Sequence, residues 1–193
     1  MKKLILHLFL LFTCAAIAQD NKTDTNRIFW NEEVKIDWSD FMGEAQEDAK
    51  VAALSSIGLP YRYLTDGEGT MEVFVEVCFI KDESWSIDDQ ENDLLLKHEK
   101  LHFDIAELHR RKIIKAVKEA EFDKSNYKQK LDEIIEKYWV EAYRKVQDQY
   151  DKDTNFSRVV KAQIEWNEKI GKELEALSEF TMTRLEVNLI HFD

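Results

Sequence analysis

The chain has 193 residues, with 39 acidic against 27 basic side chains and a formal net charge of −12. This acidity argues against nucleic acid and anionic membrane surfaces as partners. The length is enough for one domain with a substantial hydrophobic core, and no linker composition or internal repeat divides it.

The first residues have the pattern of a secretory signal peptide. Lys2 and Lys3 give a positive start, residues 4–12 are apolar, and Ala16-Ile17-Ala18 is a small-residue cleavage site. The apolar stretch is too short to anchor the chain in a bilayer. The sequence therefore predicts that residues 1–18 are cleaved after export.

Cys14 offers lipoprotein processing as an alternative, but residues 11–13 are a poor context for lipidation, so ordinary cleavage is preferred. Cleavage leaves Cys78 as the single cysteine, which excludes an internal disulfide. No later segment is apolar enough to insert stably into a membrane. We therefore expect a soluble protein in the periplasm or outside the cell.

The first part of the mature chain has the features of a small sheet. Residues 19–33 are polar and are predicted to form a flexible leader, followed by a single domain from 34 to 193. Residues 34–38 alternate and predict a short strand. The next unit is a hairpin with arms at 51–64 and 70–80 and a turn at 65–69.

The second part is mainly helical. An apolar stripe with helical spacing predicts a helix over residues 88–119, capped by Ser86 or Asp88. Further helices are predicted over 131–146 and 157–178, and a last strand over 181–192. Strands followed by helices indicate an α+β fold, with a small antiparallel sheet packed on a layer of about three helices.

The predicted helix 88–119 contains an H-E-x-x-H motif, His98-Glu99-Lys100-Leu101-His102. Two histidines four residues apart lie on one face of a helix, where both can bind one Zn²⁺. Glu99 between them is placed to act as the general base toward a metal-bound water. The alternative is that both are core histidines paired to carboxylates, but two histidines without partners on an apolar stripe would be costly to bury. The motif predicts a zincin-like arrangement.

A catalytic zinc needs a third protein ligand, which the motif does not supply. His109 lies about 10 Å further along a continuous helix from His102, beyond the reach of the same ion, and is expected to be packed or to act indirectly. Glu107 points roughly opposite His98 and is expected to pair with a basic neighbour. The third ligand must come from a later segment, and spacing leaves five carboxylates open: Glu136, Glu141, Asp148, Asp151 and Asp153.

Several stretches resemble the bacterial domain-of-unknown-function family 922, whose members are described as predicted secreted zinc-dependent proteases. The resemblance is most specific around the H-E-x-x-H motif and extends from about residue 34 to 170. Its stretches are Ile36-Asp37-Trp38-Ser39-Asp40-Phe41, Ser84-Trp85, residues 95–108, Gln149-Tyr150-Asp151-Lys152-Asp153-Thr154, Gln163 and Trp166.

One departure from the family pattern bears on the third ligand. After the Tyr-Asp-x-x-Thr block the family continues with x-His-Gly, whereas this chain has Asn155-Phe156-Ser157. Phe156 therefore stands where a histidine ligand is expected. The resemblance leaves three outcomes: Asp151 is the ligand, Asp153 replaces it, or the site is incomplete.

Two functions follow as expectations. The first is an exported zinc metallopeptidase that cleaves peptide or protein substrates, with His98, His102 and Asp151 as metal ligands and Glu99 as base. In it, the strand 70–80 is a candidate to bind an extended peptide by strand addition. The alternative is a non-catalytic or degenerate envelope protein with the same fold, which binds a partner or a structural metal.

Overall fold

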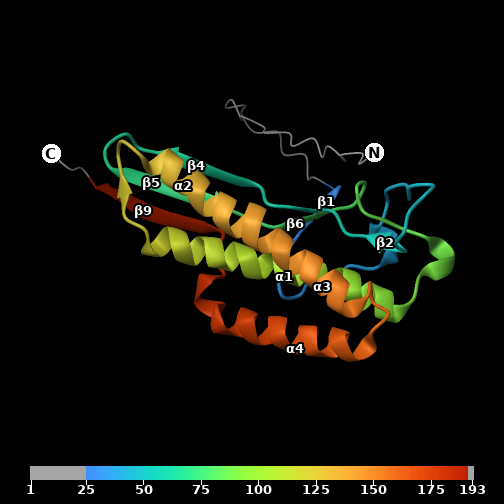
Figure 1. The fold of residues 1–193 in the computed structure, drawn as a ribbon. Coiled ribbons are helices and arrows are strands. Elements are labelled where there is room, and N and C mark those ends of the chain that lie inside the picture. The colour runs from blue at the N-terminus through green and yellow to red at the C-terminus, as the bar shows by residue number, and fades with distance from the viewer. Residues whose placement is uncertain (1–24, 191–193) are drawn as a thin grey trace, which may run out of the picture.

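The computed structural model describes residues 25–190, and its strands gather on one side of the long helices (Figure 1). The predicted signal peptide, with Cys14 and the cleavage site, lies outside the described residues. The strands are β1 (Arg27–Phe29), β2 (Ala53–Leu54), β3 (Ile57–Gly58), β4 (Tyr61–Thr65), β5 (Thr70–Val75), β6 (Cys78–Ile80), β7 (Trp85–Ser86), β8 (Phe122–Asp123) and β9 (Arg184–Ile190).

These strands form three small sheets. The largest has the order β4-β5-β9-β8, a second has the order β1-β6-β3, and β2 pairs with β7. All neighbouring pairs are antiparallel except β8 and β9. The predicted α+β class is confirmed, although the sheet is divided into three.

The helical part consists of α1, a long composite helix and α4. The helices are α1 (Asp93–Glu119), α2 (Tyr127–Ile135), the π-helix η3 (Glu136–Tyr143), α3 (Arg144–Thr154) and α4 (Val160–Ala176). Short 3₁₀ turns are η1 (Trp38–Asp40), η2 (Asp88–Gln90) and η4 (Ser178–Phe180). No helix within residues 25–190 has the length and apolar character needed to span a bilayer.

Helix α1 is the centre of the fold, because three apolar clusters surround it. Ile113 and Ile114 pack toward β5 and α2, whereas Phe103 and Ala106 pack toward β6. Leu101 and Ile105 pack against Tyr150 of α3 and the apolar side chains of α4. A helix that is buried nearly all round holds its polar side chains in fixed positions, and this applies to the H-E-x-x-H motif.

Helix α1 begins five residues later than predicted. Residues 88–90 form η2, and neither Ser86 nor Asp88 caps the helix. The cap is Asn92, whose side-chain oxygen accepts hydrogen bonds from the backbone N–H groups of Leu94 and Leu95. An asparagine at this position satisfies two of the free donors at the helix start.

The second predicted helix, 131–146, is part of a longer one. The structure extends it from Tyr127 to Thr154 as α2, η3 and α3 without a break. The π-helical segment packs against α1. The third predicted helix, 157–178, begins at Val160 because residues 155–157 have left-handed backbone.

The predicted hairpin is confirmed at β4 and β5, where Tyr61 pairs with Val75 and Thr65 with Met71. In its turn, one carboxylate oxygen of Asp66 accepts from the backbone N–H groups of Glu68, Gly69 and Thr70. The arms are shorter than predicted, because 51–64 divides into β2, β3 and β4 and 70–80 into β5 and β6. The last strand is confirmed as β9.

Two predictions near the start of the domain are wrong. Residues 34–38 form no strand; Asp37 instead caps η1 in a capping box with Asp40. The predicted flexible leader 19–33 contains β1, which pairs with β6. The indole of Trp30, directly after β1, donates a hydrogen bond to Asp104 of α1 at 2.9 Å. Folded structure therefore begins before residue 34, because this segment completes the edge of a sheet.

Candidate metal centre

The two motif histidines meet at their Nε2 atoms. His98 and His102 lie one turn apart on α1, and their Nε2 atoms are 3.2 Å apart. The two rings are nearly perpendicular, and His98 is almost fully buried. This is the arrangement that the i, i+4 spacing predicts.

Asp151 of α3 completes a triangle with the two imidazoles. Its Oδ1 lies 3.1 Å from the Nε2 atom of His98 and 3.1 Å from that of His102. These three residues form a group with the composition and spacing of a metal site, among the residues that the structure describes. The structure therefore brings together the two histidines and one of the five carboxylates that spacing left open.

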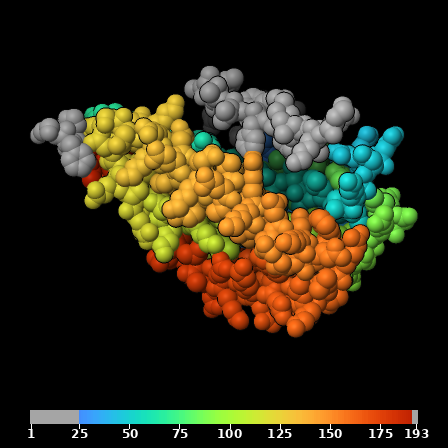
Figure 2. Space-filling view, in the orientation of Figure 1, coloured from blue at the N-terminus to red at the C-terminus, as the bar shows by residue number. Residues whose placement is uncertain are grey.

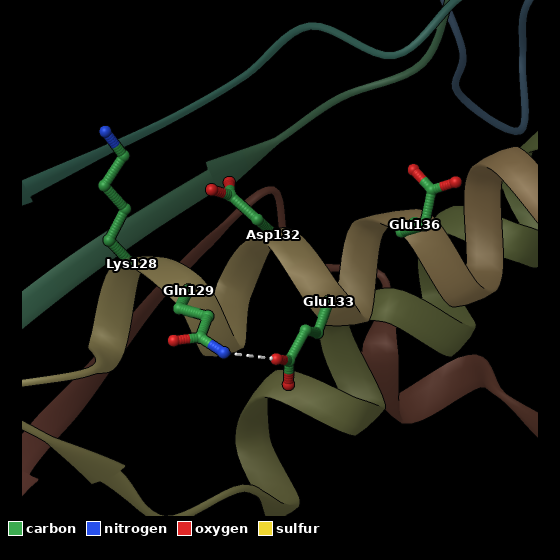
Figure 3. A pocket seen from close by; sticks show the side chains of 5 residues that line it. All are labelled: Lys128, Gln129, Asp132, Glu133 and Glu136. Atoms are coloured by element: carbon green, nitrogen blue, oxygen red, sulfur yellow. Dashed lines mark hydrogen bonds between the residues drawn. The ribbon is translucent and has the colours of Figure 1, made fainter.

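Two of the other carboxylates have different surroundings. Asp153 accepts hydrogen bonds from Gln149 at 2.6 Å and from the indole of Trp166 at 3.1 Å. Glu136 lines a separate surface cavity on α2 and η3, beside Asp132 and Glu133 (Figure 3). In that cavity the side chain of Gln129 donates to Glu133 at 2.8 Å.

The outer nitrogens of both imidazoles face glutamine oxygens. Nδ1 of His102 is 2.6 Å from Oε1 of Gln147, and Nδ1 of His98 is 3.2 Å from Oε1 of Gln163. Gln147 uses its amide nitrogen to donate to the carbonyl of His102, which fixes its orientation. Tyr150 likewise donates its hydroxyl to Oε1 of Gln163 at 2.8 Å.

These contacts assign the tautomer of each ring. An amide oxygen only accepts, so each Nδ1 carries the proton and each neutral ring has its lone pair on Nε2. Three acceptor atoms (two Nε2 and Oδ1 of Asp151) then point at one another. Such a triangle is unfavourable unless a proton or a metal ion lies within it.

The electrostatics of the triangle agree with this reading. Burial lowers the pKa of His102, but the hydrogen bond to Asp151 and the charges of Glu99 and Asp151 outweigh it and raise the pKa overall. Burial would raise the pKa of Asp151, yet hydrogen bonds to both histidines hold it well below its usual value. Both shifts describe a site that attracts positive charge.

Tyr150 packs directly on the histidines. Its ring stacks on that of His98 with 4.5 Å between centroids, and its hydroxyl also lies 3.1 Å from the His98 carbonyl. Burial raises the pKa of this phenol, so it keeps its proton and remains a donor to Gln163. Tyr150 therefore fixes both the plane of His98 and its glutamine partner.

Glu99 is buried beside the triangle, and among the described residues its side-chain partner is Ser55. The hydroxyl of Ser55, between β2 and β3, donates to Oε2 of Glu99 at 2.7 Å. Glu99, both histidines and Asp151 line the same cavity, with a volume of about 700 Å³. This volume is within the range typical of ligand pockets.

The cavity is lined by segments that are far apart in sequence. Besides α1, residues 51–55 around β2 line it, as do Tyr143, Gln147 and Phe156. Figure 2 shows the segment around β2 in cyan next to the end of α3 in orange on one face of the molecule. Burial raises the pKa of Tyr143 to about 12.

Phe156 lies in an unusual turn between α3 and α4. Asn155, Phe156 and Ser157 have φ angles of 47°, 53° and 71°, the left-handed region. The turn reverses the chain so that Gln163 of α4 reaches His98. Phe156, which stands where the resemblance predicts a histidine, is partly exposed and lines the cavity.

His109 and Glu107 are outside the metal-ligating group, as predicted. His109 is buried, and its Nδ1 lies 2.9 Å from the carbonyl of Tyr138. Burial lowers its pKa to about 4, and its Nε2 has no hydrogen-bond partner in the described part of the chain. Glu107 pairs with Arg110 and Arg111 at 2.6 and 2.8 Å, which confirms the expected basic partner.

Four supporting residues were not assigned a role from sequence. Gln147 lies four residues before Asp151 on the same helix, so helical spacing could have indicated a shared face. Tyr150 and Gln163 belong to the stretches that resemble the family, but the resemblance did not indicate that they contact His98. Ser55 had no sequence signal.

Comparison with known proteins gives one family match. Residues 83–157 match the family model described as "Bacterial protein of unknown function (DUF922)". The match includes the H-E-x-x-H motif and Asp151, whereas residues 34–82 and 158–170 of the resemblance lie outside it. No curated protein and no solved structure matches the chain significantly.

Proposed function

We propose that this protein is an exported zinc metallopeptidase with a zincin-like arrangement. In this proposal His98, His102 and Asp151 hold Zn²⁺, and Glu99 is the general base. The observation that carries it is the triangle of three acceptor atoms, 3.1–3.2 Å apart, with both histidine tautomers fixed by glutamines.

The donor set fits zinc in kind and in spacing. Nitrogen and carboxylate donors bind Zn²⁺ at about 2.0–2.2 Å, so neighbouring donors in a tetrahedron are about 3.3–3.6 Å apart. The observed separations are shorter than this range by only a few tenths of an ångström. Calcium and magnesium prefer sites made of oxygen atoms, which argues against them here.

The surrounding residues fit the role of a hydrolase site. Bound zinc supplies a water of lowered pKa and polarises a carbonyl group. Glu99 faces the same cavity and can accept a proton, while Ser55 holds one of its carboxylate oxygens. Gln147 and Gln163 orient the imidazoles, and Tyr150 packs against His98. These are the supporting contacts that a catalytic metal site needs.

Metal binding is tested by calorimetry on the metal-free mature protein. We expect one Zn²⁺ per chain, with binding abolished in His98→Ala, His102→Ala and Asp151→Asn. Asp153→Asn is the matched control, because this carboxylate lies two residues away and is bonded to Gln149 and Trp166. Wild-type protein that takes up no zinc would end the proposal.

Catalysis is tested with a mixed peptide library and zinc-loaded protein. We expect cleavage by the wild type and a loss of at least 10²-fold in Glu99→Gln, the usual effect of removing a general base. Zinc binding should persist in this variant. Equal cleavage by both proteins, or none by either, would favour the alternative of a non-catalytic metal-binding protein.

A further inference from the structure

The cavity of the metal centre is bordered by a strand with one unpaired edge. Among the described strands, β2 pairs only with β7. By contrast, β5 lies between β4 and β9, and β6 lies between β1 and β3. The stretch 70–80, expected from sequence to accept a peptide, is therefore already paired on both sides. An extended peptide cannot add to it.

The register of β2 shows where its free backbone groups point. Ala52 accepts a hydrogen bond from the N–H of Ile87 at 2.8 Å, and Ala53 lies opposite Ser86. In an antiparallel pair, hydrogen-bonded and non-bonded positions alternate. The N–H and C=O of Ala53 therefore point away from β7, to the outer edge.

The same segment is attached to the proposed general base. Residues 51–55 line the cavity together with Glu99 and both histidines. Ser55, two residues after Ala53, donates its hydroxyl to the Glu99 carboxylate. A chain that pairs with the outer edge of β2 is thus led along the cavity to the metal centre.

Two exposed apolar side chains line the cavity. Leu54 of β2 is 42% exposed and Phe156 is 38% exposed, and both line the cavity. They come from segments that are far apart in sequence, β2 and the turn after α3, and meet at this one cavity. An apolar substrate side chain placed between them would be removed from water on both sides.

We propose that the substrate is an extended peptide that pairs with the outer edge of β2 and places an apolar side chain between Leu54 and Phe156. This inference rests on the proposed function, because it assigns the substrate class of that same cavity. Backbone hydrogen bonds to β2 give affinity without sequence preference, and the apolar contact gives selectivity.

The backbone part is tested by peptide binding, without any need for cleavage. The probe is a fluorescein-labelled octapeptide of alternating Thr and Leu, titrated by anisotropy into zinc-loaded Glu99→Gln protein. A series of probes carries one N-methyl group at successive positions. Because only the peptide residue opposite Ala53 directs its N–H group to β2, we expect about tenfold weaker binding when that position is N-methylated and little change at its two neighbours.

The apolar part is tested with paired variants. We expect Leu54→Ser and Phe156→Ser to weaken binding of the Thr/Leu probe about tenfold or more, and to leave a Thr/Ser probe unchanged. Ile164→Ser is the matched control, since Ile164 is 54% exposed but lies on α4 outside the cavity. Zinc binding should be unchanged in all three variants.

The outcomes separate this inference from the proposed function. Failure of the zinc titration would remove the peptidase proposal itself. Normal zinc binding with no probe binding, or with equal loss at every N-methyl position, would overturn the β2 inference alone. Equal binding by Leu54→Ser, Phe156→Ser and the wild type would overturn the assigned apolar contact.

Discussion

Helix α1 carries two buried polar clusters with opposite balances of donors and acceptors. In its second half, Glu107 accepts from Arg110 and Arg111. The arginines also donate to the carbonyls of Met182 and Leu174. In its first half, His98, His102 and Asp151 direct three acceptor atoms at one point.

The comparison separates a structural cluster from a candidate binding site. The arginine cluster pairs its donors and acceptors within the chain, so it serves to join α1 to α4 and to the segment after η4. The histidine cluster is incomplete by itself and requires a positive charge. Buried polar residues therefore indicate a ligand only when donors and acceptors do not balance.

The largest expected effect tests the structural cluster. Glu107→Ala leaves two buried guanidinium groups without their carboxylate, and we expect the free energy of unfolding to fall by about 3–5 kcal/mol. Urea denaturation of the metal-free protein measures it. Glu119→Ala on the same helix is the control, because its contact with Lys115 is exposed and is worth at most about 1 kcal/mol. Similar losses in both variants would contradict the comparison.

Zinc binding at the histidine cluster should raise the free energy of unfolding. At a free zinc concentration a thousandfold above Kd, we expect stabilisation of about 4 kcal/mol in urea denaturation. Asp151→Asn should lose this gain, and Glu119→Ala should keep it. Stabilisation of equal size in Asp151→Asn would show that zinc binds elsewhere.

Sequence reasoning located α1 and the two candidate metal-ligating histidines because both depend on local spacing. The i, i+4 relation between His98 and His102 holds in any helix. The third ligand could not be chosen, because Asp151 meets them only after the chain has formed α2, η3 and α3 and returned. Spacing left Asp151 and Asp153 open alike, although the two occupy different environments.

The failed predictions have a related cause. Residues 34–38 alternate like a strand, but the capping box of Asp37 and Asp40 favours a 3₁₀ turn there. The polar segment before residue 34 was expected to be flexible, yet β1 finds a partner in β6. Pairing of this kind depends on the tertiary structure and leaves no local pattern.

A smaller effect is expected from the glutamines that orient the histidines. Gln163→Leu and Gln147→Leu remove the acceptor for one Nδ1 proton, so we expect zinc affinity to fall about 10–100-fold. Calorimetry at constant pH measures the change. Gln129→Leu is the matched control, because Gln129 lies in the separate surface cavity on α2 and η3, where it donates to Glu133 (Figure 3). Unchanged affinity in both site variants would refute the tautomer assignment.

The smallest effect concerns the pH dependence of the metal-free protein. The pKa of His102 in the folded protein is above its usual 6.5, because its hydrogen bond to Asp151 and the charges of Asp151 and Glu99 outweigh burial. Its contribution to stability is complete below pH 6.5 and is lost as the pH rises through the folded pKa. Urea midpoints of the metal-free protein should therefore fall over this range, and His102→Gln should remove this part of the fall.

Zinc should reverse the sign of this dependence. Metal binding requires both imidazoles to be deprotonated, so zinc affinity grows as the pH rises through the same range. With zinc at a fixed free concentration, the urea midpoint should rise where that of the metal-free protein falls. The arginine cluster provides the contrast, because its guanidinium groups stay charged throughout. Parallel pH profiles with and without zinc would mean that proton and metal do not share the triangle of His98, His102 and Asp151.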